Sequence, residues 1–543
     1  MTALSLPGNA LSGQIPAEIG DLTALNHLVL EGNRLNGPIP PELGDLPALY
    51  ALMLGGCELT GGIPPALGRL ATLTSLELRG NPLGGTLPPE LGDLSALRWA
   101  NLASIGASGT IPPQYGDLAA LEHLMLGGNQ LTGGIPPELG RLAALRTLDL
   151  PGNKLSGPIP AALGDLSQLN SLVIHNNQLS GAIPPEFGGL DNVYELSLSG
   201  NALTGGLPPQ LGDMERLVYC YLGKNQLSGP IPPELGGLAT LVVLDLGGNQ
   251  LSGTIPVAMG DLFSLGALYL DNNQLSGSVP AELVNLRVGF LDIGHNALWT
   301  RSGDVRALLD AQDPDWRETQ TVAPNDVRIA AWDGTAVDLA WTPIRYAEDG
   351  GTYEVAYSTQ PDGPFTLHGT TVDKSADTYR VDAVPLGTSY WAVRTHTPAH
   401  DEQQSDLWSE YGPSHMVPPA EGDKVVHVPL IEGGRPSNSL YGITLDPASP
   451  ETLANYASVI VNVYYDMAWD GNLRIYAQGL NQGSRVGGYH ATAVSPGRGT
   501  ASCSFTHLDG TVDQVRIRMQ DARDAEIVYE VTLDVDYVFG DGQ

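Results

Sequence analysis

The feature that most constrains the fold of this chain is an asparagine that recurs every 24 residues through the N-terminal half of the sequence. Cys57 and Ile105 occupy two grid points, and Asn296 follows one residue early, so that there are thirteen copies in all. A repeat of this length predicts a solenoid in which each copy forms one coil and stacks on its neighbours. Ten asparagines keep the grid: Asn9, Asn33, Asn81, Asn129, Asn153, Asn177, Asn201, Asn225, Asn249 and Asn273.

The residues around each asparagine follow the pattern L-x-x-L-x-L-x-x-N-x-L-x-G-x-I-P-x-x-L-G-x-L. The alternating leucines predict a short strand with its leucines facing inward. We expect the asparagine amide to bond backbone groups of the adjacent coil, so that the asparagines stack into a ladder. The glycine allows a tight bend, and the Ile-Pro pair predicts an extended segment outside the ladder. One coil cannot bury its own leucines, so the coils must share a continuous core.

This pattern resembles the plant-type class of leucine-rich repeats, known from receptor-kinase ectodomains and polygalacturonase inhibitors. The resemblance covers residues 1–298 and implies an α/β-type repeat solenoid lined by β-strands. Residues 299–322 follow as a C-terminal cap and linker, with Val305, Leu308 and Leu309 spaced for a short amphipathic helix.

Two all-β sandwich domains are predicted after the solenoid. Residues 323–418 hold short strand-like runs separated by turn residues, and Trp341 and Tyr390 resemble the core tryptophan and tyrosine corner of a fibronectin type III domain. Residues 421–543 alternate in the same way and form a second predicted sandwich of unknown family. The whole arrangement resembles bacterial surface proteins that combine leucine-rich repeats with fibronectin type III domains.

The net charge of −34 excludes several classes of partner. So acidic a surface repels phosphate backbones and anionic lipid, so we expect no nucleic acid and no anionic membrane surface as a partner. No run of about 18 apolar residues occurs, so no membrane insertion is expected. Neutral or cationic ligands are favoured.

The sequence carries no motif of a known catalytic or cofactor site, so we predict neither an enzyme nor a bound cofactor or metal. His396 and His400 have the spacing of a helical metal pair, but they lie beside Pro398 at the end of a predicted strand, which favours an ordinary loop. Cys220 takes a leucine position and should be a buried hydrophobe. The alternative function is an enzyme-associated or carbohydrate-binding role in residues 421–543.

Without catalytic chemistry, the variable strand positions on the concave face are the candidate binding site. They predict a non-catalytic recognition or adhesion protein, extracellular or at the cell surface by analogy, that binds a protein or glycan ligand. The oligomeric state stays open. Seven aromatic, polar or flexible side chains on this face are the candidate ligand-binding residues: Trp99, Asn101, His123, Met125, Tyr219, Tyr221 and Tyr269.

The fifth coil breaks the repeat rule, because Ala100 and Ala107 replace leucines and Ile105 replaces the asparagine. An alkyl side chain cannot bond a turn backbone, so the ladder should be interrupted at Ile105. An inward isoleucine would refill part of the lost volume. Two interpretations remain: compensated drift, or a repacked coil that leaves Trp99 as a binding hot spot.

The first coil is also unusual, because Met1 takes a leucine position in a repeat that is already running. Terminal repeats normally need a polar cap. The sequence predicts that a cap and an export signal precede these residues in a longer protein.

Overall fold

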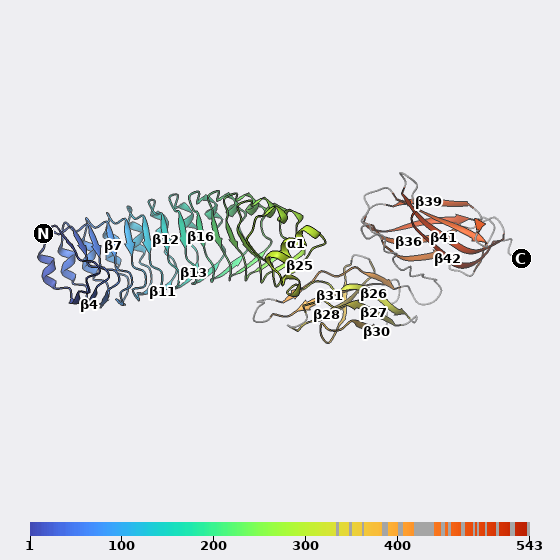
Figure 1. The fold of residues 1–543 in the computed structure, drawn as a ribbon, viewed down its shortest axis with the longest axis horizontal. Coiled ribbons are helices and arrows are strands. Elements are labelled where there is room, and N and C mark those ends of the chain that lie inside the picture. Colours follow the sequence, from blue (N-terminus) through green and yellow to red (C-terminus); the bar gives the residue numbers. More distant parts are fainter. Residues whose placement is uncertain are drawn as a thin grey trace. The chain divides into compact units, whose positions relative to one another are not determined.

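The computed structural model describes side chains in residues 1–331, 336–346, 350–360, 363–382, 390–399 and 406–415; further on, it describes the backbone of strands as far as Phe539. The chain forms two compact units, residues 1–322 with 397–409, and residues 323–396 with 410–543. Each is described by itself (Figure 1).

The first unit is built on a 13-stranded parallel sheet with one three-residue strand from each coil. Neighbouring strands pair in a register of one repeat, so that His123 lies beside Thr147 and Leu124 beside Leu148. The strands are β1 (Ala3–Ser5), β3 (His27–Val29), β5 (Ala51–Met53), β7 (Ser75–Glu77), β8 (Trp99–Asn101), β10 (His123–Met125), β12 (Thr147–Asp149), β14 (Ser171–Val173), β16 (Glu195–Ser197), β18 (Tyr219–Tyr221), β20 (Val243–Asp245), β22 (Ala267–Tyr269) and β24 (Phe290–Asp292). The middle residue of every strand of this sheet from β3 onward is buried, and it is a leucine except at Ala100 in β8 and Cys220 in β18.

A second row of parallel strands, which the sequence did not predict, forms from the residues after the grid position in every coil except that of Asn81. It is divided into a three-stranded and a nine-stranded sheet, and the Ile-Pro pairs lie outside both, as expected. The strands are β2 (Ser12–Gln14), β4 (Arg34–Pro38) and β6 (Glu58–Thr60), and then β9 (Ser108–Gly109), β11 (Gln130–Gly133), β13 (Lys154–Pro158), β15 (Gln178–Gly181), β17 (Ala202–Gly205), β19 (Gln226–Gly229), β21 (Gln250–Gly253), β23 (Gln274–Ser278) and β25 (Ala297–Trp299).

The helical part of each coil is a five-residue 3₁₀-helix, which corrects the expectation of an α/β-type coil. Each follows a proline in the extended conformation, and five residues are too few for a stable α-helix. The helices are η1 (Ala17–Asp21), η2 (Pro41–Asp45), η3 (Pro65–Arg69), η4 (Pro89–Asp93), η5 (Pro113–Asp117), η6 (Pro137–Arg141), η7 (Ala161–Asp165), η8 (Pro185–Gly189), η9 (Pro209–Asp213), η10 (Pro233–Gly237), η11 (Val257–Asp261) and η12 (Ala281–Asn285).

The asparagine ladder is confirmed. Asn129 Oδ1 accepts hydrogen bonds from the N–H groups of Ile105 at 3.1 Å and Ala107 at 3.0 Å. Its Nδ2 donates to the carbonyl oxygens of Leu102 and Leu126. Each asparagine of this kind therefore satisfies buried backbone groups of two adjacent coils.

The two grid points without asparagine differ from each other. The Cys57 thiol donates to the Leu30 carbonyl oxygen at 3.4 Å, which replaces one ladder bond with a weaker one. Ile105 has no polar side-chain atom, so the predicted interruption is confirmed. The second sheet divides in the same region, between β6 and β9, where only the isolated bridge Thr86–Ser108 remains.

The packing of the irregular coil is also confirmed: Ile105, Ala100 and Ala107 are all buried. The coil contains a further change that the sequence analysis missed. Tyr115 takes the position of a leucine in η5, is buried, and places its hydroxyl 3.4 Å from the Pro88 carbonyl oxygen. A tyrosine is larger than a leucine, so Tyr115 adds side-chain volume to the same coil in which two alanines replace leucines.

The C-terminal cap contains the predicted helix, α1 (Gly303–Gln312), with Ser302 as its N-cap. Val305 and Leu309 are buried against the last coil, and a short 3₁₀-helix, η13 (Trp316–Glu318), follows. None of the described helices is long and apolar enough to span a membrane. At the other end of the solenoid Leu6 is 40% exposed, and Leu4 and Leu11 are only partly buried.

The strands that follow the cap form two antiparallel sheets, in which Trp341 and Tyr390 are buried, as expected. Trp341 contacts Tyr353 edge-on at 5.3 Å. The likeness to fibronectin type III stays a prediction. One sheet contains β26 (Asn325–Trp332), β27 (Val337–Thr342) and β30 (Thr378–Val381), and the other β28 (Thr352–Ser358), β29 (Thr366–Thr370), β31 (Ser389–Thr397), β32 (Leu407–Trp408) and β33 (His415–Val417).

The remaining strands form one mainly antiparallel sheet, which agrees with an all-β C-terminal region. A second sandwich stays a prediction, as does any binding or enzymatic role there, because the side chains lie outside the described residues. The strands are β34 (Ser439–Asp446), β35 (Glu451–Leu453), β36 (Ser458–Met467), β37 (Leu473–Asn481), β38 (Ser484–Arg485), β39 (Gly488–Val494), β40 (Gly497–Thr506), β41 (Gly510–Asp521) and β42 (Ile527–Phe539).

Candidate functional site on the 13-stranded sheet

The outward side of the 13-stranded sheet, which we call the sheet face, presents straight rows of variable side chains. A three-residue strand directs its middle residue into the core and its first and third residues outward. Because the register equals one repeat, outward residues of successive coils line up. All seven predicted binding residues lie in these rows and form two clusters, Trp99, Asn101, His123 and Met125 in one, and Tyr219, Tyr221 and Tyr269 in the other.

The first cluster is held by a network of contacts. The rings of Trp99 and His123 lie 4.8 Å apart. Glu77 Oε2 accepts a hydrogen bond from Asn101 Nδ2 at 2.9 Å and a longer one from Trp99 Nε1 at 3.5 Å. Glu77, which is 5% exposed and lies beside Asn101 in the row, therefore orients the Asn101 and Trp99 side chains through these hydrogen bonds.

This network divides the roles of the predicted residues. Asn101 is buried and bonded to Glu77, so it supports the site rather than presenting a free amide. Trp99, His123 and Met125 are partly exposed and present ring and thioether surface. Burial lowers the pKa of His123, so the imidazole is neutral at pH 7, and its Nδ1 lies 3.0 Å from Thr147 Oγ1.

The second cluster is aromatic. Tyr219 and Tyr221 stack with ring planes 4° apart and centroids 6.4 Å apart. Tyr269 packs against Phe290 at 4.8 Å, and Asp245 lies between Tyr221 and Tyr269 in the row. Phe290 lies in the neighbouring row, in register with Ala267, was not selected as a site residue from the sequence, and is 45% exposed.

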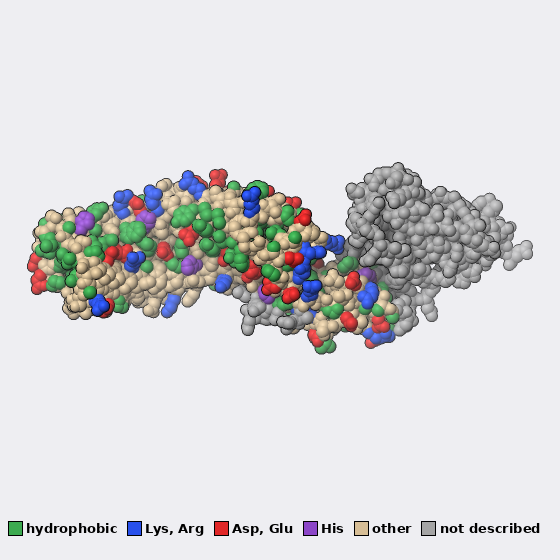
Figure 2. All heavy atoms as spheres, viewed as in Figure 1, with side chains coloured by type: hydrophobic (Ala, Val, Ile, Leu, Met, Phe, Trp, Pro, Cys, Tyr) green, Lys and Arg blue, Asp and Glu red, His purple; other side chains and the backbone are tan. Residues whose placement is uncertain are grey.

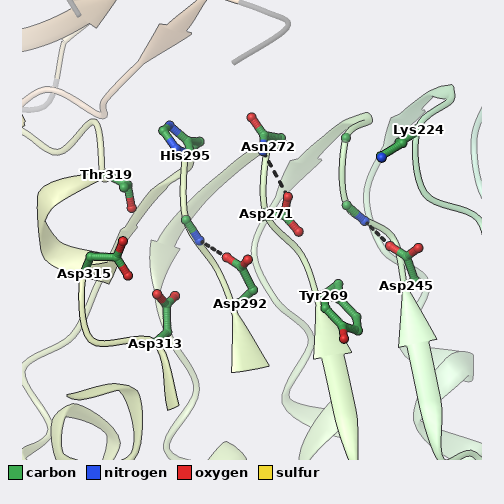
Figure 3. A pocket seen from close by; sticks show the side chains of 13 residues that line it. Lys224, Asp245, Tyr269, Asp271, Asn272, Asp292, His295, Asp313, Asp315 and Thr319 are labelled. Atoms are coloured by element: carbon green, nitrogen blue, oxygen red, sulfur yellow. Dashed lines mark hydrogen bonds between the residues drawn. The ribbon is translucent and has the colours of Figure 1, made fainter. Parts of the chain in front are cut away.

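Beside the second cluster lies a pocket of about 540 Å³ whose lining includes Tyr269 and Lys224. In Figure 3 the side chains of Asp292, Asp313 and Asp315 point toward the same space. Figure 2 shows acidic side chains near this end of the solenoid. Five aspartates line the pocket: Asp245, Asp271, Asp292, Asp313 and Asp315. We call this set the acidic pocket.

Glycines create the space for these carboxylates. A Cβ atom at Gly247 would lie 2.5 Å from Asp271 Oδ1, and one at Gly223 would lie 2.5 Å from Asp245 Oδ1. The Gly247 N–H also donates to Asp245 at 3.0 Å, and the Gly294 N–H donates to Asp292 at the same distance. Small residues after each strand therefore let the aspartates fold back over the backbone.

The electrostatics of the acidic pocket favour neutralisation of its carboxyl groups. Burial raises the pKa values of Asp245 and Asp292, and repulsion from Asp271 adds to both shifts. Burial raises the pKa of Asp313 to about 7. In the described part of the chain, no three histidine, cysteine or acidic side chains converge in a way that could hold a metal ion.

The sequence identified only part of this site. Asp245, Asp271 and Asp292 belong to the solenoid and could be placed from the repeat grid. Asp313 and Asp315 come from the turn after α1, which has no repeat to place it, so they were missed. Their only signal was the run of acidic residues after the cap helix, Asp310 to Asp315.

Comparison with known proteins supports the repeat assignment. The family described as Leucine Rich Repeat matches eight segments, residues 24–46, 72–94, 120–142, 144–166, 168–190, 192–214, 240–262 and 264–286. No curated protein matches the chain. The N-terminal half is thus a solenoid of leucine-rich repeats.

Two solved structures share the fold of this solenoid. The Arabidopsis receptor kinase HAESA, in complex with the peptide hormone IDA and the co-receptor SERK1, is 33% identical, with a TM-score of 0.52 over 55% of this chain and 50% of that one. A TDR receptor is 34% identical, with a TM-score of 0.53 over 55% of this chain and 52% of that one. The chain spans about half the length of each.

Proposed function

We propose that this protein is a non-catalytic binding protein that holds a peptide segment of a protein ligand on the sheet face. The observation that carries the proposal is the exposure of aromatic side chains on that face. Tyr219 is 37% exposed and Phe290 is 45% exposed, and they lie among partly exposed Tyr221 and Tyr269. Aromatic side chains that are kept in water and concentrated on one face are typical of the anchors of protein interfaces.

The geometry of the face suits an extended segment. Successive strands present equivalent positions at the spacing of neighbouring β-strands, about 4.8 Å, so a chain that runs across the strands meets one coil after another. The similar structure of HAESA was determined with a peptide hormone, which supports a peptide ligand here as well. The glycan alternative has no such support.

Location and domain roles are part of the same proposal. We propose that the protein acts outside the cell, secreted or at the surface, because the similar solenoids belong to a receptor kinase for a peptide hormone and to a second receptor. The β-rich second unit then serves as a spacer or attachment module. Its fibronectin-like assignment and the bacterial type of the arrangement rest on the sequence resemblance.

The test is a selection of 12-residue peptides from a random display library on the full chain, followed by affinity measurements with variants. Trp99→Ala or Tyr221→Ala should weaken recovered peptides about tenfold or more. The matched control is Phe263→Ala, which removes an aromatic ring that is 65% exposed on the turn after η11, away from the sheet face. Peptides that bind all three variants like the parent would contradict a site on the sheet face. A parallel glycan array tests the other ligand class.

A further inference from the structure

The geometry points to a basic side chain, arginine or lysine, as the ligand group held at the C-terminal end of the sheet face, with its charge in the acidic pocket and its carbon chain on the neighbouring rings. This inference rests on the proposed function and adds the chemistry and the direction of the ligand. Three observations support it: the aromatic rings beside the acidic pocket, the aspartates of the pocket that form no ion pair in the described residues, and the contrast with the first cluster.

The aromatic rings form a platform next to the pocket. Tyr269 belongs to both, because it lines the pocket and packs against Phe290. Tyr219 and Tyr221 extend this aromatic surface on β18, which is separated from β22 by β20. Tyrosine and phenylalanine faces attract cations and also pack against the methylene groups of lysine and arginine. The platform thus suits a side chain that is apolar along its length and charged at its end.

The aspartates of the pocket accept hydrogen bonds but are not paired with a cationic side chain in the described residues. Five aspartates line it, and in the part of the chain that the structure describes none of the five forms an ion pair with lysine, arginine or histidine. The one lysine of the lining, Lys224, is exposed. A positively charged ligand side chain is therefore complementary to the acidic pocket, because its aspartates are not paired with a cationic side chain in the described residues.

One hydrogen-bond acceptor in the lining is also open. Asn272 Nδ2 donates to Asp271 Oδ2 at 3.0 Å, but the enclosed Asn272 Oδ1 accepts no hydrogen bond from the described residues. Buried acceptors normally have a donor. A guanidinium or ammonium group, which offers several N–H donors and no acceptor, supplies what Asn272 and the aspartates lack.

The two clusters of the sheet face differ in this respect, which gives the ligand a direction. At the first cluster, Glu77 is satisfied by Asn101 and Trp99 and lies near Arg79 at 3.7 Å. The charge of Glu77 is thus already compensated, and one further aspartate, Asp149 beside Met125, lies next to the first cluster, whereas five aspartates line the acidic pocket. A ligand with a basic residue is thus expected to place it over β22 and β24 rather than over β8.

The test uses the peptides recovered by the selection described above, at about 50 mM salt. We expect lysine or arginine next to an apolar residue to be enriched over the starting library. The double variant Asp245→Asn, Asp271→Asn should lower the affinity of those peptides at least tenfold, since asparagine keeps the shape and the acceptor for Gly247 N–H but removes the charge.

The matched control is Asp165→Asn, Asp213→Asn, which removes two exposed charges at the ends of η7 and η9. It should change the affinity less than twofold, so it separates the pocket from general attraction to an acidic protein. The inference is overturned by recovered peptides without enriched basic residues, or by basic peptides that bind both double variants equally. If such peptides still lose affinity with Tyr221→Ala or Trp99→Ala, the proposed function stands and only the basic ligand group is wrong. A library that yields no binder contradicts both.

Discussion

Asp313 Oδ2 accepts a hydrogen bond from the Ile293 N–H at 2.9 Å, in the place where a further coil would offer a main-chain carbonyl. In the preceding coils the equivalent donors, such as Leu246 N–H, bond to the next strand, here at Tyr269 O. The Asp313 carboxyl group therefore takes the place of a backbone carbonyl at the edge of the parallel sheet. Because this group is titratable, the hydrogen bond depends on pH.

The first prediction concerns the pH dependence of this end of the solenoid. Burial raises the pKa of Asp313 from 3.8 to about 7, so the folded state holds a proton that the unfolded state has lost over this range. The free energy of unfolding should then fall as the pH rises from about 4 through 7. Asp313→Asn keeps the acceptor and removes the charge, so it should abolish this decline and stabilise the cap at pH 8.

Hydrogen exchange measures this locally, because solenoid ends open before the centre does. We expect the protection factor of the Ile293 amide at pH 8 to be higher in Asp313→Asn than in the parent, and equal or lower at pH 5. Asp213→Asn, at an exposed position, is the control and should behave like the parent. A lower protection factor for Asp313→Asn at pH 8 would show that the ionised carboxylate is the better acceptor.

The second prediction concerns Gln320, which continues the asparagine ladder into the cap. Its Oε1 accepts from the Leu298 N–H at 2.8 Å, and its Nε2 donates to the Ile293 carbonyl oxygen at 2.8 Å. Gln320→Ala leaves the buried Leu298 N–H without a partner, while the Ile293 carbonyl oxygen keeps its hydrogen bond from Asn296 Nδ2, so the change should cost roughly 1–3 kcal/mol of stability. The surface glutamine change Gln178→Ala should cost less than about 0.5 kcal/mol. Equal midpoints of chemical unfolding for the two variants would contradict the ladder role.

The regular asparagines and the cap residues Gln320 and Asp313 show how far the fold could be predicted from the sequence. The Asn grid and leucine spacing fixed the coils, the ladder and the rows of the sheet face, because each copy repeats the same local geometry. Gln320 and Asp313 also bond backbone groups of the last coil, but they are not asparagines and do not lie on the 24-residue grid, so the repeat did not predict them. The acidic pocket needs Asp313 and Asp315 together with the last coils, and only the folded chain brings these together.

The second sheet and the 3₁₀-helices show a different limit. The Q-L-S-G segments gave no strand signal, because their pairing partners lie a full repeat away and the strand forms only by stacking. The interrupted ladder at Ile105 was predicted correctly because it depends on chemistry alone. Tyr115 was missed although it stands at a leucine position of the repeat, because an aromatic residue there keeps the apolar pattern of the coil.

The third prediction concerns the glycine in the L-G pair of each 3₁₀-helix. A Cβ atom at Gly68 would lie 2.2 Å from the Glu90 carbonyl oxygen of the next coil, which is backbone and cannot move aside easily. Gly68→Ala should therefore destabilise the solenoid by several kcal/mol or split its unfolding into two transitions. At Gly134 the nearest atom to such a Cβ is 3.6 Å away, so Gly134→Ala should be nearly neutral. Thermal unfolding by circular dichroism compares them, and similar curves would mean that the coils separate freely.

The last prediction concerns volume conservation in the irregular coil. Ala100, Ile105 and Ala107 are buried, and Tyr115 is buried in the same coil. Restoring the repeat residues at the first three positions adds two leucines to a core in which the tyrosine already fills space. The triple variant Ala100→Leu, Ile105→Asn, Ala107→Leu should thus be overpacked and lose about 1–3 kcal/mol of stability.

Adding Tyr115→Leu should recover that loss, while Tyr115→Leu alone in the parent should be destabilising, because it leaves a cavity. The stability effects of the two changes are then strongly non-additive, as expected for residues that share one volume. Additive effects in chemical unfolding would mean that Tyr115 is independent of the other three. The affinity of a sheet-face peptide for the quadruple variant decides the remaining question: unchanged binding means that the coil drifted with compensation, and weakened binding means that its repacking positions Trp99.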